Sequence, residues 1–230
     1  MACRMLRRMK LHNYFRSSAS FRVRIALELK GLAFEYVPVH LAKGEQHAPA
    51  FAQLQGDALV PVLELDDGQR LIQSMAIIEY LDETRPAPAL LPQGALDRAR
   101  VRALAQMVAC EIHPLNNLRV LKYLKHELQV PDPAKDAWYR HWVRSGLEAY
   151  ERQLALFATE REKAGLAPSV YSWGDTPTLA DCCLVPQIFN GRRFHVDMDG
   201  LPRTMSAFDA CMALPAFQRA QPSACSDHEA

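Results

Sequence analysis

The serines of the run Arg16-Ser17-Ser18-Ala19-Ser20 could do chemistry, because the run precedes an apolar stretch with helical spacing. A helix N-terminus exposes N–H groups and carries about half a positive charge, so it favours a bound anion. Serine hydroxyls can donate further hydrogen bonds to that anion, which includes an ionised thiol. The same serines could equally serve only as helix caps, and from this loop alone capping is the better interpretation.

Two further motifs in the first half of the chain could bind a ligand through backbone and amide groups. Gln73 and Ser74 stand where an expected strand turns into an expected helix, so they could hold a carboxylate, although Ser74 could also be a simple N-cap. Val60 precedes Pro61, and an X–Pro bond of this kind is ordinarily trans. Neither motif identifies a ligand by itself.

Charged candidates lie in both halves of the chain. Arg16 is beside the serine run, and Arg193 follows a predicted helix. An isolated arginine is by default a solvated surface residue. His113 comes just before Pro114, which should kink a helix and expose backbone groups. No second histidine stands at ligand spacing, so we expect no metal site.

Several other conspicuous residues are interpreted as structural. The segment Thr178-Leu179-Ala180-Asp181 is typical of a variant capping box that starts a core helix. Six cysteines lack paired metal-ligand spacing, and we expect reduced thiols that mostly fill the core. The cysteines are Cys3, Cys110, Cys182, Cys183, Cys211 and Cys225, and the tryptophans expected to pack are Trp138, Trp142 and Trp173.

The composition excludes several classes of partner. With 27 basic and 26 acidic residues the formal net charge is +1, so no bulk field attracts nucleic acid or an anionic membrane. No apolar run approaches the roughly 20 residues of a membrane helix, and no secretory signal is evident, so we expect a cytoplasmic protein. Arg4, Arg7 and Arg8 lie near Met5 and Met9, which indicates an alternative start codon rather than a nucleic-acid arm.

The elements that must position these residues are predicted by hydrophobic periodicity and turn residues. The first half predicts a strand at 10–15, a helix from Phe21 capped by Ser20 and stopped by Gly31, and a parallel strand at 34–39. A hairpin at 60–73 and a helix from Ser74 to Thr84 follow. The second half predicts only helices, at 97–128, 134–157 and 178–191, with shorter ones after Pro202 and Pro215. We therefore expect domains at 9–86 and 93–222.

From about Met9 to Pro222 the chain resembles the zeta class of cytosolic glutathione transferases. The segment 14–27 reads YFRSSASFRVRIAL and is similar to the class signature S-S-C-x-W-R-V-R-I-A-L. Val60-Pro61, the segment 73–81 and Leu179-Ala180-Asp181 agree in the same order, and His113-Pro114-Leu115-Asn116-Asn117-Leu118-Arg119 looks like the bacterial members. The resemblance implies an α+β two-domain fold, with an N-terminal thioredoxin-like βαβ-ββα domain and a C-terminal all-helical domain.

The resemblance also implies roles for individual residues. Ser17 and Ser18 would donate hydrogen bonds to the sulfur of glutathione, with Ser17 preferred, while Ala19 departs from the family's usual cysteine. The Val60–Pro61 bond would be cis. Arg16 and Arg193 would hold substrate carboxylates. Further glutathione or substrate contacts are implied for Gln46, Val60, Gln73, Ser74, His113, Asn117 and Arg119.

The implied activity is glutathione-dependent cis–trans isomerisation of a maleyl dicarboxylic acid by reversible thiolate addition, with maleylacetoacetate, an intermediate of aromatic amino-acid catabolism, as the first candidate. Maleylpyruvate is an alternative, because both substrates carry the same cis-enone acid. A glutathione-conjugating or dehalogenating transferase would use the same thiolate, and a non-enzymatic binding module is a rival of another class. The serine run and Gln73-Ser74 argue against the module. The resemblance alone implies a homodimer.

Overall fold

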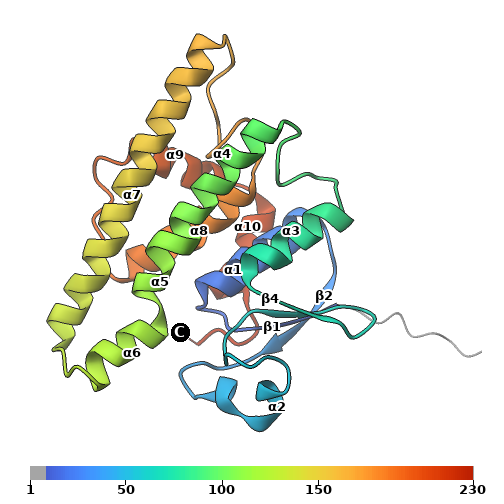
Figure 1. The fold of residues 1–230 in the computed structure, drawn as a ribbon, viewed down its shortest axis with the longest axis vertical. Coiled ribbons are helices and arrows are strands. Elements are labelled where there is room, and N and C mark those ends of the chain that lie inside the picture. The colour runs from blue at the N-terminus through green and yellow to red at the C-terminus, as the bar shows by residue number, and fades with distance from the viewer. Residues whose placement is uncertain (1–8, 230) are drawn as a thin grey trace, which may run out of the picture. The chain divides into compact units, whose positions relative to one another are not determined.

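The structure is a computed structural model that describes residues 9–229 (Figure 1). Residues 1–8, for which the sequence indicates an alternative start codon, lie outside this range, and so does Cys3. The chain forms two compact units: the first joins the residues up to Ala89 with those from Pro215 onward, and the second runs from Leu90 to Leu214. The domain bounds 9–86 and 93–222 stay a prediction.

The first unit is built on a four-stranded sheet with the strand order β2-β1-β3-β4. In the centre, Leu11 pairs with Tyr36 of the parallel neighbour and with Leu63 of the antiparallel one. The last two strands form a hairpin whose turn needs the left-handed backbone of Gly68, at φ 89°. The strands are β1 (Met9–Asn13), β2 (Phe34–Pro38), β3 (Val62–Glu64) and β4 (Arg70–Ile72). This sheet confirms the predicted βαβ unit followed by a hairpin.

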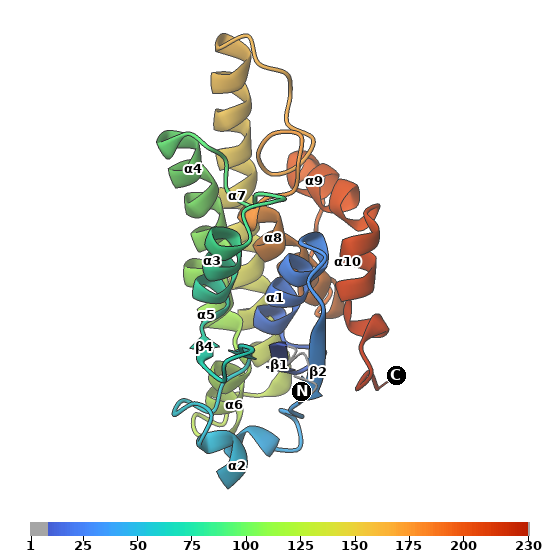
Figure 2. The same cartoon turned by 90° about the vertical axis from the view of Figure 1, so that its right-hand side faces the viewer.

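The helices of the first unit are α1 (Ser18–Leu29), α2 (Pro49–Ala52), α3 (Ser74–Thr84) and α10 (Pro215–Ala220), with short 3₁₀ turns η1 (Glu45–His47) and η3 (Pro222–Ala224). Helix α1 packs against both α3 and α10, and Figure 2 shows α10 running beside α1. Because α1 contacts neighbours on several sides, its residues from Ser20 to Leu27 are all buried. The helix that begins at the serine run is therefore a core element.

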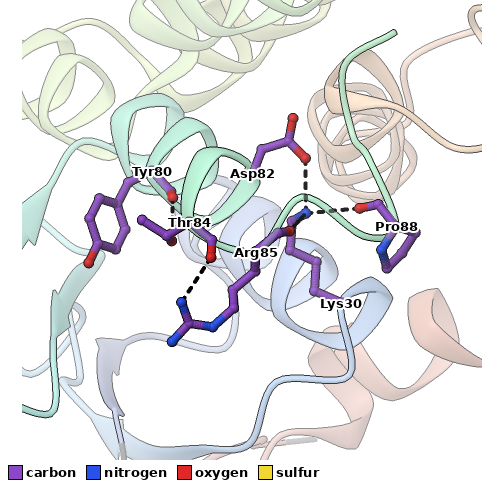
Figure 3. Close-up of polar contacts among 6 residues, drawn as sticks. All are labelled: Lys30, Tyr80, Asp82, Thr84, Arg85 and Pro88. Carbon is purple, nitrogen blue, oxygen red and sulfur yellow. Dashed lines mark hydrogen bonds and ion pairs between the residues drawn. The ribbon is translucent and has the colours of Figure 1, made fainter. Parts of the chain in front are cut away.

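A buried lysine ties the ends of two helices to the segment that leaves the first unit (Figure 3). The Lys30 ammonium, at the end of α1, donates to the Asp82 carboxylate at 2.9 Å and to the carbonyls of Arg85 and Pro88 at 2.7 and 2.9 Å. Its side chain is 0% exposed, and all three of its N–H donors have an acceptor. The contacts fix the end of α3 and the chain after it against α1.

The second unit is all-helical among the residues described. Its helices are α4 (Ala95–Gln106), the π-helical turn η2 (Met107–Ile112), α5 (His113–Asn116), α6 (Leu118–His126), α7 (Asp132–Lys163), α8 (Leu179–Arg193) and α9 (Pro202–Met212). Helix α8 contacts α4 and α9 and is buried almost throughout. It starts at the predicted capping box, where the buried Asp181 carboxylate accepts hydrogen bonds from the Thr178 N–H and hydroxyl and from the Ser172 N–H. None of the helices in residues 9–229 is both long and apolar enough to cross a membrane.

The prediction of a single kinked helix at 97–128 is wrong, because α4, η2, α5 and α6 occupy this range. Pro114 has no N–H to continue the ladder, and the π-helical turn comes directly before α5, closing with the His113 N–H on the Val108 carbonyl. The helix then breaks completely at Asn117, which has extended backbone angles and caps α6. The indole N–H of Trp138 donates to the Leu115 carbonyl at 2.8 Å, which satisfies a backbone group at this interruption.

Candidate active site

The serine run forms the N-terminus of α1, but the capping residue is not the one predicted. Ser17, rather than Ser20, is the N-cap, with extended backbone angles and a side chain that accepts the Ser20 N–H at 3.2 Å. Helix α1 therefore begins three residues earlier than the apolar spacing indicated, and Ser18, Ala19 and Ser20 form its first turn. Both serines have capping chemistry, so periodicity alone could not choose between them.

Capping leaves the Ser17 hydroxyl proton available for a ligand. A serine hydroxyl has two acceptor sites and one donor, and the bond from the Ser20 N–H uses only an acceptor site. Ser17 is half-buried, whereas Ser18 is buried at 6% exposure. Arg16, just before Ser17, is exposed, and its guanidinium lies 4.8 Å from the centroid of the Phe15 ring. The structure thus combines an open donor, a helix N-terminus and a nearby cation in one short segment.

Arg24, which sequence reasoning missed as a supporting residue, holds the chain that leads into this segment. Arg24 is 2% exposed, and its guanidinium donates to oxygens of Asn13, Tyr14, Phe15 and Ala220 at 3.0, 3.4, 3.0 and 2.8 Å. Burial lowers the pKa of Arg24, but arginine stays charged in proteins. The sequence signal that could have indicated this role is a single charged residue within the otherwise apolar run Val23 to Leu27.

Val60 and the entrance to the serine run share one apolar cluster. Tyr14, Phe15 and Val60 pack in this cluster with Val39, Phe51 and Val62. The Val60–Pro61 peptide bond is cis, as the resemblance implied. Within residues 9–229 neither the N–H nor the C=O of Val60 makes a backbone hydrogen bond. A buried residue with an unused donor and acceptor can pair with an extended ligand backbone.

Gln46 offers an acceptor from a neighbouring loop. It lies in η1, after the left-handed Gly44, and is 6% exposed. Its Oε1 has no hydrogen-bond partner among the described residues. A buried amide oxygen without a donor costs about 1–3 kcal/mol, so its presence indicates a place for a ligand donor.

Gln73 and Ser74 lie at the N-terminus of α3 in a strained local conformation. Gln73 has φ 66° and ψ 113°, which few residues other than glycine adopt, and it is the N-cap. Ser74 is therefore not the N-cap but the first helical residue, and its hydroxyl accepts from the buried Arg22 guanidinium at 3.3 Å. The Gln73 side chain makes no capping bond, and an α-helix N-terminus of this kind favours an anion such as a carboxylate.

In the second unit, the helix break joins three predicted residues into one group. The Asn117 amide nitrogen lies 3.3 Å from the Nε2 atom of His113, and its Oδ1 accepts the Arg119 N–H at 3.0 Å. An amide NH₂ can only donate, so Nε2 acts as an acceptor in this contact. The three residues do not share one helix face, because Arg119 belongs to α6 and is exposed.

Arg193, the last residue of α8, is exposed and oriented by its own helix. Its guanidinium donates to the Asn190 side-chain oxygen at 2.7 Å and lies near the Phe194 ring. Phe194 stacks on Tyr139 with ring centroids 3.7 Å apart. Burial raises the pKa of Tyr139, and the positive charge of Arg193 opposes this shift. Arg192 differs, because its guanidinium packs over Phe208 at 4.4 Å.

The groups of the first unit fit glutathione. They comprise a hydroxyl donor at a helix N-terminus, a buried backbone at Val60 without a backbone hydrogen bond in the described residues, an amide oxygen at Gln46 without a partner there, and the N-terminus of α3 after Gln73. In that order, these groups suit a thiol, a peptide backbone, an amide donor and a carboxylate, all of which glutathione contains. No group of three or more histidine, cysteine or acidic side chains suited to a metal occurs within the described range.

Comparisons with known proteins match the chain to a family. Residues 7–83 match the family model described as "Glutathione S-transferase, N-terminal domain". The chain is 49% identical to a maleylpyruvate isomerase from Ralstonia sp, over 94% of this chain and 98% of the relative. It is 46% identical to a probable maleylacetoacetate isomerase from Vibrio cholerae, again over 94% of this chain and 98% of the relative.

Among the solved structures that match over nearly the whole chain, two carry informative descriptions. A holo structure of a maleyl pyruvate isomerase, described as a bacterial zeta-class glutathione S-transferase, is 48% identical with a TM-score of 0.90, and covers 96% of this chain and 100% of its own. A maleylacetoacetate isomerase from Anaeromyxobacter dehalogenans, with bound dicarboxyethyl glutathione and citrate, is 42% identical with a TM-score of 0.83, and covers 97% and 98%. The chain therefore belongs to the zeta class of glutathione S-transferases, the family of the glutathione-dependent maleyl isomerases.

Proposed function

We propose that the chain catalyses the glutathione-dependent cis–trans isomerisation of a maleyl dicarboxylic acid. The observation that carries the proposal is Ser17 at the N-cap of α1, with its hydroxyl proton uncommitted beside the helix N-terminus. The bound dicarboxyethyl glutathione in the A. dehalogenans isomerase supports it, because that ligand joins a dicarboxylic acid to glutathione. When bound, glutathione would supply a thiolate that adds reversibly to the double bond and so permits rotation.

The residues of the first unit would bind and ionise the thiol. Ser17 would donate its hydroxyl hydrogen bond to the sulfur, and the N–H groups at the start of α1 would favour its negative charge. Free thiols titrate near pKa 8.5, and about 1.4 kcal/mol of preferential stabilisation lowers that pKa by one unit. Gln46, Val60, Gln73 and Ser74 would hold the rest of the tripeptide, and Ser18 is the second candidate donor.

Arginines would hold the carboxylates of the acid. Arg16 is exposed next to Ser17, and Arg193 is exposed at the end of α8 with Asn190 orienting its guanidinium. Two N–H donors on one planar group suit a carboxylate better than a single ammonium does. His113, Asn117 and Arg119 form a further polar group of the second unit, to which we assign glutathione or substrate contacts.

Maleylacetoacetate is our first candidate substrate, and maleylpyruvate is the second. Names of relatives divide between the two: the V. cholerae relative is named for the former and the Ralstonia relative for the latter. The 48% identity and TM-score of 0.90 to a maleyl pyruvate isomerase are the specific observations that favour the second. Parallel assays of both acids, with and without glutathione, decide the substrate.

The same assays separate an isomerase from a conjugating or dehalogenating transferase. We expect free glutathione to stay constant while the cis acid converts to the trans acid, because the thiol is released unchanged. Stoichiometric loss of glutathione would assign the chain to the transferases instead. Absence of glutathione binding would favour the non-enzymatic module. We also propose a homodimer, which light scattering of the purified protein tests.

A further inference from the structure

The C-terminal segment of the first unit contacts the chain that leads into the serine run. The Asp227 carboxylate accepts the Phe15 N–H at 3.3 Å, and its other oxygen accepts the Tyr36 hydroxyl. Burial and this hydrogen bond to Asp227 raise the pKa of Tyr36, so the phenol remains a donor at neutral pH. Phe15 is two residues before Ser17, so Asp227 bonds the backbone at the base of the proposed thiol-binding loop.

Apolar contacts reinforce this polar one. The His228 ring packs edge-on against the Phe15 ring with centroids 5.4 Å apart. Cys225 packs against the cluster that contains Tyr14, Phe15 and Val60. The Arg24 guanidinium that binds the Phe15 carbonyl also binds the carbonyl of Ala220, the last residue of α10, which precedes this segment. The backbone of Phe15 is thus held through both its N–H and its C=O.

A second contact reaches the loop that carries Gln46. The Glu229 carboxylate lies 3.2 Å from the His40 Nε2 and 2.9 Å from the Lys43 Nζ. The Lys43 pair is exposed and contributes little, whereas His40 is 7% exposed and packs against the Tyr14 ring at 5.0 Å. Residues of one short segment therefore contact two of the loops to which we assign glutathione: the one before Ser17 and the one that carries Gln46.

We propose that the segment Cys225–Glu229 is a positioning element of the glutathione site, with Asp227 as its principal positioning residue. The inference rests on the proposed function. A donor must lie within about 0.5 Å of its working position to stabilise a charge. The bond from the Phe15 N–H to Asp227 restrains the backbone two residues before Ser17. Asp227 touches no reacting atom and acts through Phe15 on Ser17.

Full-length variants test this with two measurements that a purely stabilising role would not change. Calorimetry gives the glutathione Kd, and the ultraviolet absorbance of the thiolate against pH gives the pKa of the bound thiol. We expect Asp227→Ala to weaken glutathione binding about tenfold and to raise the thiol pKa by about one unit. Glu35→Gln is the matched control, because it removes an exposed carboxylate next to Tyr36 and should change neither quantity.

Conservative variants keep the test valid where alanine disturbs folding. Asp227→Asn retains an acceptor for the Phe15 N–H, so its effect should be smaller, and Tyr36→Phe removes only the hydroxyl donor. The Tyr36→Phe/Asp227→Asn double variant should bind glutathione no more weakly than the weaker-binding of the two single variants. Both substitutions remove the same bond, from the Tyr36 hydroxyl to the Asp227 carboxylate. An unchanged Kd and thiol pKa with a lowered Tm would overturn the inference, as would unfolding of all three single variants or an equal effect of Glu35→Gln.

The two proposals can fail separately. If the wild-type chain binds glutathione but isomerises neither acid, the proposed function is wrong, and the binding data on Asp227 still decide the positioning role. If isomerisation is observed and Asp227→Ala leaves the Kd and the thiol pKa unchanged, only the positioning role is wrong.

Discussion

The replacement Ser17→Ala removes one interaction that the structure shows and a second that we propose. The first is the N-cap bond from the Ser20 N–H, whose loss costs about 0.5–2 kcal/mol of unfolding free energy. The second is the proposed bond from the hydroxyl to the bound thiolate, worth about 1.5–3 kcal/mol because its acceptor is charged. The second loss should raise the pKa of the bound thiol by about one to two units and lower turnover at saturating glutathione by about tenfold or more.

Three measurements on the same samples distinguish these losses. Denaturant unfolding reports the cap, thiolate absorbance against pH reports the thiol pKa, and initial rates with the cis acid report turnover. Ser17→Thr keeps both a cap and a hydroxyl, so it should retain most of the thiol ionisation. Ser18→Ala changes a buried first-turn residue and is the comparison. If Ser17→Ala leaves the thiol pKa and turnover near wild type, the reasoning is refuted for Ser17, and an effect of Ser18→Ala would transfer the role there.

The remaining predictions concern four other positions. Ala19→Cys should change the rate little, because the proposed thiolate belongs to glutathione; a large gain in initial rate would mean that a protein thiol takes part. Arg16→Met and Arg193→Met should lower isomerase kcat/KM about tenfold or more with an intact glutathione Kd, and unchanged kinetics would make that arginine a surface charge. Lys30→Met should cost about 3–5 kcal/mol by denaturant unfolding, since it leaves a buried carboxylate without its cation, whereas the surface-pair control Lys10→Met should cost under about 1 kcal/mol.

The first unit could be predicted well because its signals are local and agree with one another. The strand at 10–15, the helix ended near Gly31 and the parallel strand at 34–39 follow from alternation, helical spacing and one glycine stop. The capping box at Thr178 and Asp181 could likewise be predicted from the sequence, since both partners lie within one helical turn. Whether Ser17 or Ser20 is the N-cap of α1 could not be predicted, because the answer depends on which backbone N–H groups the tertiary structure satisfies.

Features that depend on distant residues could not be predicted from local patterns. The proline at 114 predicts a defect in a helix, but whether the defect is a kink or a π-helical turn followed by a break depends on the partners of the freed carbonyls. The bonds of Asp227 to Phe15 and Tyr36 join residues about two hundred positions apart in the chain, and no spacing rule connects them. The roles assigned to the site residues stay predictions.

The Lys30 contacts also have a consequence for chemical labelling. Amine-reactive reagents attack the neutral form of an accessible amine, and the Lys30 nitrogen is enclosed by a carboxylate and two carbonyls with no exposed side-chain surface. Lys43, with a side chain that is 61% exposed, should be modified readily in the native protein. Acetylation of Lys30 therefore requires α1, α3 and the segment through Pro88 to separate, so the extent of its labelling over time reports how often the first unit opens.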